Sequence, residues 1–500
     1  MSTPARAALP APVDVAALDA LARQVQRQLE LTAYSARSWV PGSAPAAAPD
    51  GAGPVDETTE VLIVGGGHAG LAIAFGLWRA QIRDVLVVDA SPAGREGPWR
   101  TYARMHTLRT PKHLTGPDLG VPGLTPRAYY EAAYGADAWR AITHIGREVW
   151  QDYLGWFRRV LDLPVRNGTT VTLIEPPTEA DGPFVVHVVR ADGTAARIAA
   201  RRVVLATGLE GSGGWKTPPL ISDALPRDRW AHTAEPIDFA ALAGRRVGVL
   251  GGGASGFDNA ACALEAGAEV ELFVRRPALP RVNPYRWMEF HGFVQHYPAW
   301  PDERKWRFNH HLDVIDQPPP QETLWRCLDH DRFTVHLGTC WEAVSMAGDG
   351  AVQVRTTRGA HRFDFVIAAT GIAIDLHLRP ELRAVVDRLA CWADRFEPPP
   401  ELASDALGAH PYLGEGFEHT ARYAGDEAWA RRLHHFAFAA KLSMGVTGHR
   451  LSGLTAGVDR LVHHIGRQLF LEHGDHFLDS FLTYDEPELV SLERRPAPPR

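Results

Sequence analysis

Cysteine is scarce in this sequence, and its placement excludes two kinds of chemistry. The four cysteines among 500 residues are Cys262, Cys327, Cys340 and Cys391, and no two of them form a CxxC pair. A disulfide framework and a zinc knuckle both need closely spaced cysteines, so we expect neither. A protein without disulfides suits a reducing cytoplasm.

Long apolar runs and an excess of one charge are also missing. No apolar segment reaches the roughly 18 residues that a membrane span needs, and the opening MSTPARAALPAPVD has no apolar signal core. Lysine and arginine total 52 against 59 acidic residues, a formal net charge of −7 that attracts neither nucleic acid nor an anionic membrane surface. We therefore expect a cytoplasmic protein with no nucleic-acid or membrane partner.

Metal-ligand spacing is absent as well, although histidine is abundant. The 23 histidines include two adjacent pairs, His434 with His435 and His463 with His464, but no cluster of cysteine, histidine and aspartate has the spacing of a metal site. We expect most histidines to be surface or core residues, and no bound metal.

The sequence contains the same glycine-rich motif at two places. In the first copy, EVLIVGGGHAG, an apolar run leads into Gly65, Gly67 and Gly70, and a helical apolar pattern follows. Such a strand, turn and helix bind a dinucleotide: the first glycine permits the turn, the second admits the pyrophosphate, and the third lets helix and strand approach. Asp89 ends the next strand, where an acid binds the ribose hydroxyls of an adenosine without a 2′-phosphate.

The second copy, RVGVLGGGASG, differs in one informative respect. Its second strand, AEVELFV, ends in two arginines at the position where the first copy has its acid. Guanidinium groups there suit the 2′-phosphate of NADP, although a solvated strand end is the alternative. The cofactor-binding candidates of this copy are Gly251, Gly253, Ser255, Gly256, Arg275 and Arg276.

Two Ala-Thr-Gly segments flank the second copy. One contains Thr207 and the other Thr370, and each follows an apolar run typical of a buried strand. This order of motifs resembles the class B flavin monooxygenases over about residues 58–470. The resemblance implies an α/β fold with two Rossmann-like dinucleotide-binding domains, the NADPH domain inserted into the FAD domain. It also implies FAD and NADPH as cofactors and oxygen transfer from a flavin hydroperoxide to a nucleophile such as a neutral amine.

The same resemblance divides the chain into five parts. Residues 1–56 hold a helix candidate, VAALDALARQVQRQLEL, and a Pro/Ala linker, and residues 57–215 form the first part of the FAD domain. The NADPH domain, with a Trp-rich insert, spans residues 216–365. The FAD domain returns over residues 366–485 with a C-terminal helix, and residues 486–500 form a flexible tail.

Within the family, N-hydroxylation of a small amine or amino acid is the leading prediction. Disulfide reductases of similar architecture need a cysteine pair beside the flavin, and none is present. The FxGxxxHxxxW signature of Baeyer–Villiger enzymes is replaced by WAHTAEPIDFAALAGRR, with His232 in a related position. S-oxygenation, Baeyer–Villiger oxidation, an NADPH oxidase or reductase, and a redox-sensing module without turnover remain alternatives.

The predicted substrate site is a cationic loop beside the flavin. Trp99, in Gly-Pro-Trp, resembles a family residue that lies along the flavin ring. Arg104, His106, Arg109 and Lys112 follow with few acids nearby, which suggests an anionic substrate. FAD phosphate contacts and a solvated loop are the alternatives. The loop MHTLRTPKHLTGPDLG resembles that of bacterial amino-acid N-monooxygenases, including those that oxidise aspartate to a nitro acid.

Three further candidates lie beyond the second nucleotide motif. Arg286 adds a cation to the substrate site, and Asn283 is the catalytic candidate for a nicotinamide or peroxide contact. Leu454 begins a closing helix that resembles the family helix facing the flavin, although membrane docking is an alternative for that helix. The Trp-rich insert, residues 285–333, caps the cleft, packs as core or forms a subunit contact, so homo-oligomerisation stays open.

Overall fold

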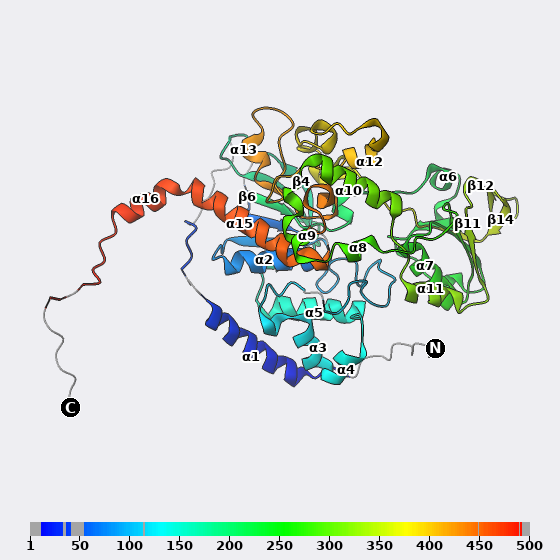
Figure 1. The fold of residues 1–500 in the computed structure, drawn as a ribbon, viewed down its shortest axis with the longest axis horizontal. Helices are drawn as coiled ribbons and strands as arrows, with labels where there is room; N and C mark the ends of the chain where they lie inside the picture. Colours follow the sequence, from blue (N-terminus) through cyan, green and yellow to red (C-terminus); the bar gives the residue numbers. More distant parts are fainter. Residues whose placement is uncertain are drawn as a thin grey trace.

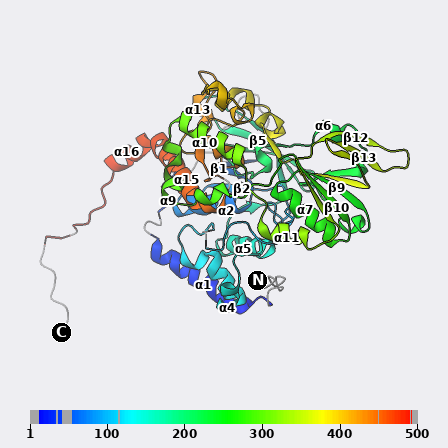
Figure 2. The same cartoon turned by 45° about the vertical axis from the view of Figure 1, so that its right-hand side comes forward.

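The chain folds into two lobes that lie side by side (Figures 1 and 2). This computed structural model describes residues 12–33, 37–41, 55–113, 116–448, 450–489 and 491–492. The smaller lobe is built on a parallel sheet, and the larger lobe on a mixed sheet whose strands β4 (Thr169–Glu175) and β5 (Phe184–Arg190) pair antiparallel with their neighbours while its other pairs are parallel. Helices pack against both sheets, which confirms the predicted α/β fold with two dinucleotide-binding domains.

The larger lobe contains a seven-stranded sheet whose central strands are mostly buried and apolar, apart from the buried ion pair of Glu60 and Arg202. Its order is β3 (Val165–Arg166), β2 (Val85–Val88), β1 (Glu57–Val64), β6 (Ala195–Leu205), β5 (Phe184–Arg190) and β4 (Thr169–Glu175), with β17 (Leu433–His435) also pairing with β6. The strand β1 runs parallel to both β2 and β6, as continuous burial on both faces of a central strand allows.

Helices cover one face of this sheet, and mostly irregular chain covers the other. The helix α2 (His68–Arg79) packs against α15 (Leu454–Glu472) and α5 (Arg147–Val160), with Phe75 and Phe157 buried between them. The other face meets residues 376–433 through Leu382, Val385 and Trp429. Short helices in the larger lobe are α4 (Ala136–Ala141), α12 (Asp405–Gly408), α13 (Glu427–Ala430) and α14 (Lys441–Met444).

The smaller lobe is inserted between two parts of the larger one. Its parallel sheet has the order β11 (Phe333–Leu337), β10 (Glu269–Val274), β9 (Arg246–Leu250), β15 (Phe365–Ala368) and β8 (Trp230–His232). The helices α7 (Ala254–Glu265) and α11 (Gln321–Leu328) pack on one face. The other face meets α6 (Pro219–Ser222) and the antiparallel strands β12 (Trp341–Met346), β13 (Val352–Thr356) and β14 (Gly359–Phe363).

The chain crosses between the lobes through a pair of short strands. β7 (Gly213–Trp215) pairs antiparallel with β16 (Ile372–Ile374). The predicted boundary between residues 365 and 366 is wrong by a few residues, because β15 pairs with β9 and belongs to the smaller lobe. The return crossing therefore follows Ala368.

The Trp-rich insert bridges the two lobes. It forms α8 (Pro284–Trp287), α9 (His291–His296) and α10 (Asp302–Ile315) before α11. The Tyr297 hydroxyl donates to the Leu442 carbonyl at 3.0 Å, and the Trp306 indole donates to the Leu402 carbonyl at 2.9 Å. The residues around Tyr297 and Trp306 therefore pack as core, which was one of the alternatives predicted for the insert.

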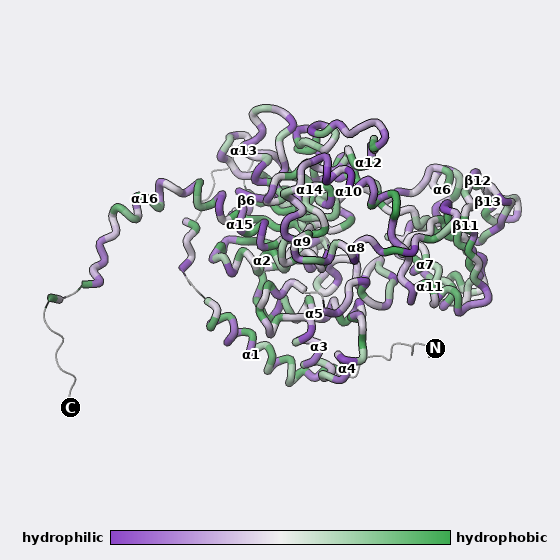
Figure 3. Tube along the Cα trace, viewed as in Figure 1, coloured by the Kyte–Doolittle hydropathy of each residue, from purple (hydrophilic) through white to green (hydrophobic). Residues whose placement is uncertain are grey.

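Both ends of the chain contribute helices. The predicted N-terminal helix is confirmed as α1 (Val15–Thr32), which packs on α3 (Pro126–Tyr134). The helix α16 (Gly474–Leu482) extends away from both lobes (Figures 1 and 3). Most of the predicted linker and most of the predicted flexible tail lie outside the described residues. In the part of the chain that the structure describes, no helix is long and apolar enough to cross a membrane.

We expect the buried ion pairs at Arg202 to control stability. Arg202 on β6 is fully buried and pairs with Glu60 on β1 and Glu472 at the end of α15. Arg202→Met should lower the free energy of unfolding by about 3–5 kcal/mol, because it removes the nearest and fully buried charge partner of the Glu60 carboxylate. Urea unfolding monitored by circular dichroism measures this loss.

Two further variants provide the control. Arg201→Met removes a more exposed guanidinium that lies 3.7 Å from Glu60, and it should cost less. Adding Glu60→Leu to Arg202→Met should restore part of the loss, because apolar side chains can replace a buried ion pair. Equal losses for Arg201→Met and Arg202→Met would contradict the prediction.

Candidate functional site

The first glycine-rich turn lies between β1 and α2, and its backbone leaves no room for two side chains. Gly65 has φ of 110°, and a Cβ there would lie 2.4 Å from the Ala206 carbonyl oxygen. A Cβ at Gly70 would lie 1.9 Å from the Gly65 carbonyl oxygen. At Gly67 a Cβ would meet no protein atom within 4 Å, which leaves an open cradle at the start of α2. This cradle fits a pyrophosphate at a helix N-terminus.

Asp89 stands beside the same turn, at the end of β2. Its carboxylate accepts hydrogen bonds from the Gly66 and Ser91 backbone N–H groups, each at 2.7 Å. These bonds fix the half-buried side chain next to the cradle and leave lone pairs for the ribose hydroxyls of an adenosine.

Two unpartnered polar atoms mark where the rest of FAD fits. The buried Nε2 atom of His68, at the start of α2, has no hydrogen-bond partner among the described residues. The same holds for Nε1 of Trp99, whose ring centroid lies 6.1 Å from that of His68. Burial lowers the pKa of His68 to about 4, so its ring is neutral at pH 7. The open turn, Asp89 and these atoms together fit FAD.

The second turn, between β9 and α7, repeats this geometry. Gly251 has φ of 123°, and a Cβ there would lie 2.2 Å from the Ala369 carbonyl oxygen. A Cβ at Gly256 would lie 2.2 Å from the Gly251 carbonyl oxygen, whereas Gly253 again faces open space. Ser255 is exposed in the first turn of α7, which places it beside the second cradle.

The structure separates the two arginines that follow β10. Arg275 is exposed and has no hydrogen-bond or ion-pair partner among the described residues. Arg276 donates to the Val314 carbonyl at 2.9 Å and lies 3.6 Å from the Asp316 carboxylate at the end of α10. Arg275 is therefore the guanidinium that is available to a 2′-phosphate, and the pocket fits NADPH.

The three remaining cofactor candidates are Thr207, Thr370 and Leu454. Thr207 follows the Ala206 carbonyl that packs on Gly65, and Thr370 donates to the Lys216 carbonyl at the lobe crossing. Leu454 begins α15, but its side chain is fully buried in the core, so only its backbone can face a flavin. Cofactor contacts for these three residues stay predictions.

Protein partners already occupy the cationic loop. Arg109 pairs with the buried Asp258 at 2.8 Å, and His106 lies 4.0 Å from Glu265, both acids being on α7 of the smaller lobe. The sequence shows few acids near this loop, but the fold supplies them from the other lobe. The loop is thus part of the interface between the lobes.

Two other cations of this loop are held by carbonyl groups. Arg104 donates to the Glu235 carbonyl at 3.0 Å, and Lys112 donates to the Trp139 carbonyl at 2.5 Å. Substrate binding by the four loop residues stays a prediction, since each already contacts the protein.

The candidates that follow β10 contact the same interface. Arg286 donates to the Arg109 carbonyl at 2.8 Å and pairs with Glu289 at 3.1 Å. The side-chain oxygen of Asn283 caps α8 by accepting from the Tyr285 N–H at 3.1 Å. The catalytic role of Asn283 stays a prediction, and the cap leaves its amide N–H groups without a partner among the described residues.

Sequence reasoning missed Arg450, just before α15. Its guanidinium carbon lies 3.3 Å from the centroid of the Tyr285 ring, and its Nε atom is buried without a hydrogen-bond partner. Burial lowers the pKa of Arg450, and no carboxylate of the described residues pairs with it. It meets Tyr285 where the insert joins the larger lobe. A lone arginine in a glycine-rich loop gives no sequence signal of this burial.

A surface groove lies elsewhere. A groove of about 780 Å³ is lined by the C-terminal parts of α2 and α15 together with Trp39. Gly76 and Arg79 line it, at the end of α2 remote from the glycine turn. This groove is therefore separate from the dinucleotide sites.

The fold and the two turns define a flavoprotein with two dinucleotide-binding domains, and comparison with known proteins agrees. A match to the pyridine nucleotide-disulphide oxidoreductase family covers residues 62–324. An FAD-dependent urate hydroxylase of Xanthomonas campestris pv. campestris is 46% identical over 477 residues, 95% of this chain and 98% of that protein. The chain belongs to the pyridine nucleotide-disulphide oxidoreductase family.

Solved structures share the fold at low sequence identity. An ornithine hydroxylase from Pseudomonas aeruginosa has a TM-score of 0.64 at 17% identity, covering 82% of this chain and 100% of that chain. An ornithine N-hydroxylase from Kutzneria sp. 744 has a TM-score of 0.63 at 15% identity, covering 82% and 99%. These similarities concern the fold alone.

The family match and the FAD-dependent hydroxylase relative together confirm the predicted class, an NADPH-dependent flavin monooxygenase with FAD as its cofactor. Disulphide chemistry within this family needs a pair of cysteines that relays electrons from the flavin. The four cysteines here are all free, and Cys262 and Cys327 lie on α7 and α11 of the smaller lobe. This chain therefore lacks the relay.

Gly67→Ala tests the first cradle. The added methyl group meets no protein atom, so the fold should be unchanged, but it occupies the space that fits the pyrophosphate. We expect the purified variant to carry less than about a tenth of the wild-type flavin, a loss equivalent to roughly 1.4 kcal/mol or more of binding. Flavin absorbance per protein measures this, and unchanged circular dichroism serves as the control. Full flavin content would refute the assignment.

Arg275→Ala tests coenzyme choice. Loss of a guanidinium–phosphate contact of about 1.5–3 kcal/mol should raise KM for NADPH roughly tenfold to a hundredfold while KM for NADH changes little. The neighbouring variant Arg276→Ala should have a smaller effect, because that side chain is held by Val314 and Asp316. Steady-state kinetics with NADPH and with NADH measure both KM values for each variant. Equal use of the two coenzymes by the wild-type enzyme would exclude a phosphate site.

Proposed function

We propose that this flavin monooxygenase hydroxylates a small, electron-rich and negatively charged nitrogen compound, and that urate is the first substrate to test. The observation that carries the proposal is the 46% identity to a urate hydroxylase over nearly the whole of both chains. Urate is an anion at neutral pH and a nitrogen-rich heterocycle, so it has both properties.

Arg450 supports an anionic substrate. Arg450 is part-buried, its buried Nε has no hydrogen-bond partner and no carboxylate of the described residues forms an ion pair with it, so an anion bound beside it would offset the cost of its partial desolvation. The Tyr285 ring against its face limits the movement of the side chain. The charge is thus held in place for a planar anion, with which it can form paired hydrogen bonds.

Bound FAD would supply the redox chemistry, accepting a hydride from NADPH and delivering one oxygen atom of O₂ to the substrate. The residues of the chain align the two cofactors. The pairs Arg109 with Asp258 and Arg104 with the Glu235 carbonyl join the loop after Trp99 to the smaller lobe. The insert adds a second connection, at Tyr297. Such positioning, with water excluded, is the protein's contribution to the rate.

N-hydroxylation of an amine or amino acid is the second candidate. The observation that favours it is the loop MHTLRTPKHLTGPDLG, which resembles that of amino-acid N-monooxygenases, and Arg450 would serve a substrate carboxylate equally well. Aspartate, oxidised as far as the nitro level, belongs to this candidate. The two candidates differ in product: incubation with urate or with a panel of amino acids and amines, followed by product mass, distinguishes them.

Arg450→Met tests the proposed anion contact. It keeps the length of the side chain and removes its charge, so flavin content should be unchanged while KM for urate rises about tenfold to a hundredfold. NADPH consumption should then yield more hydrogen peroxide, because a misplaced substrate fails to capture the oxygen atom.

A second arginine variant is the matched control. Arg460→Met removes another partly buried guanidinium, which donates to the Gln295 carbonyl on α9, and it should leave KM for urate unchanged. Fully coupled turnover of Arg450→Met, with wild-type KM, would remove Arg450 from the substrate site. Wild-type enzyme that oxidises NADPH with no stimulation by urate or any amine would argue against both substrate candidates.

A further inference from the structure

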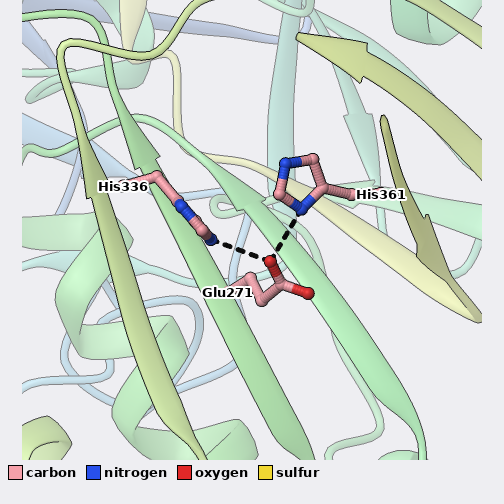
Figure 4. Close-up of side chains that lie close together, drawn as sticks. All are labelled: Glu271, His336 and His361. Carbon is pink, nitrogen blue, oxygen red and sulfur yellow. Dashed lines mark hydrogen bonds and ion pairs between the residues drawn. The ribbon is translucent and has the colours of Figure 1, made fainter. Parts of the chain in front are cut away.

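Three side chains of the smaller lobe converge on one point outside the nucleotide turns (Figure 4). Glu271 lies on β10, His336 on β11 and His361 on β14. One carboxylate oxygen of Glu271 lies 2.8 Å from Nε2 of His336 and 2.9 Å from Nδ1 of His361. All three potential ligand atoms lie within 4.8 Å of one another. Neither dinucleotide site uses these residues.

The surrounding residues fix the three side chains. The ring of His336 stacks on Phe273 at 4.5 Å, and the ring of His361 meets the same phenylalanine edge-on at 4.9 Å. Arg246 donates to the other carboxylate oxygen of Glu271 at 3.0 Å. Each ligand comes from a paired strand, so the group is positioned by rigid backbone and by contacts beyond the ligands themselves.

The donor set is that of a transition-metal site. Two imidazole nitrogens and one carboxylate oxygen match the three protein ligands that Zn²⁺ takes in open sites, where metal–ligand distances are about 2.0–2.2 Å. Ligand atoms around such an ion lie roughly 3.3 Å apart, so the atoms at 2.8 and 2.9 Å need only small outward movements. The side chains remain 13–25% exposed, which leaves access for a water molecule as fourth ligand.

The protonation of the two rings differs between a metal-free trio and a metal site. A hydrogen-bonded trio needs a proton on each ring nitrogen that faces Glu271, with both bonds directed at one oxygen. A divalent ion replaces the two protons and uses the lone pairs of neutral imidazoles instead. The charge of the ion adds to that of Arg246 in balancing the carboxylate.

We propose that Glu271, His336 and His361 bind a divalent transition-metal ion of the zinc type. The ion ties β14, and with it the three-stranded sheet, to strands β10 and β11 of the nucleotide-binding sheet. Its role is structural, because the site lies on the sheet face opposite α7. The adjacent pairs His434 with His435 and His463 with His464 take no part in it.

Zinc titration of the FAD-loaded, untagged enzyme tests the proposal. After treatment with EDTA and its removal, calorimetry should show one equivalent of ZnCl₂ bound per chain, and added zinc should raise Tm. The variants Glu271→Gln and His361→Gln should bind zinc at least about tenfold more weakly and lose the rise in Tm. Both glutamine substitutions keep a polar side chain of similar size, so the fold should persist.

A histidine paired with a single carboxylate is the matched control. His187 lies 2.9 Å from Glu175 on the sheet of the larger lobe, and among the described residues this pair belongs to no group of three potential metal ligands. His187→Gln should bind zinc as the wild type does. The proposal fails if the wild type binds no stoichiometric zinc, or if His361→Gln binds it as tightly as the wild type. In either case the three residues form a hydrogen-bonded cluster without a metal.

Discussion

The close approach of a glycine to a carbonyl group determines both nucleotide sites of this protein. At Gly65 the Ala206 carbonyl, and at Gly251 the Ala369 carbonyl, occupies the space that any side chain would need. Each contact joins the turn after a central strand, β1 or β9, to the end of a neighbouring parallel strand. The helix that follows is thereby held with its N-terminus at the edge of the sheet, where its free N–H groups can bind phosphate.

Two such sites serve one reaction only if the two lobes keep a fixed position relative to each other. The covalent connections between the lobes run through the short strands β7 and β16, which pair over only three residues each. Charged contacts from the loop after Trp99 and apolar contacts from the insert supplement it. Trp215 on β7 packs between the rings of Tyr102 and His232, which belong to different lobes. The loop predicted to bind substrate thus lies among residues that also hold the lobes together.

The sequence predicted those parts of the site that depend on local geometry. Glycine spacing, an acid at the end of a strand and the repeat of both in one chain depend on neighbouring residues, so they can be recognised without a fold. The same reasoning treated Arg275 and Arg276 as equivalent, because nothing local shows that α10 ends beside Arg276. It also treated the cationic loop as unneutralised, because Asp258 and Glu265 come from a distant helix.

By itself the sequence determined that this chain binds two dinucleotides, since the turn, the helix start and the acid or arginine are encoded within short segments. Only the tertiary structure decided which charges remain free. Arg450 becomes a part-buried cation because the insert places the Tyr285 ring over it. Glu271 meets His336 and His361 across 65 and 90 residues because three strands lie adjacent in the smaller lobe. Burial and pairing of charge depend on contacts between segments far apart in the chain, and no local pattern carries that information.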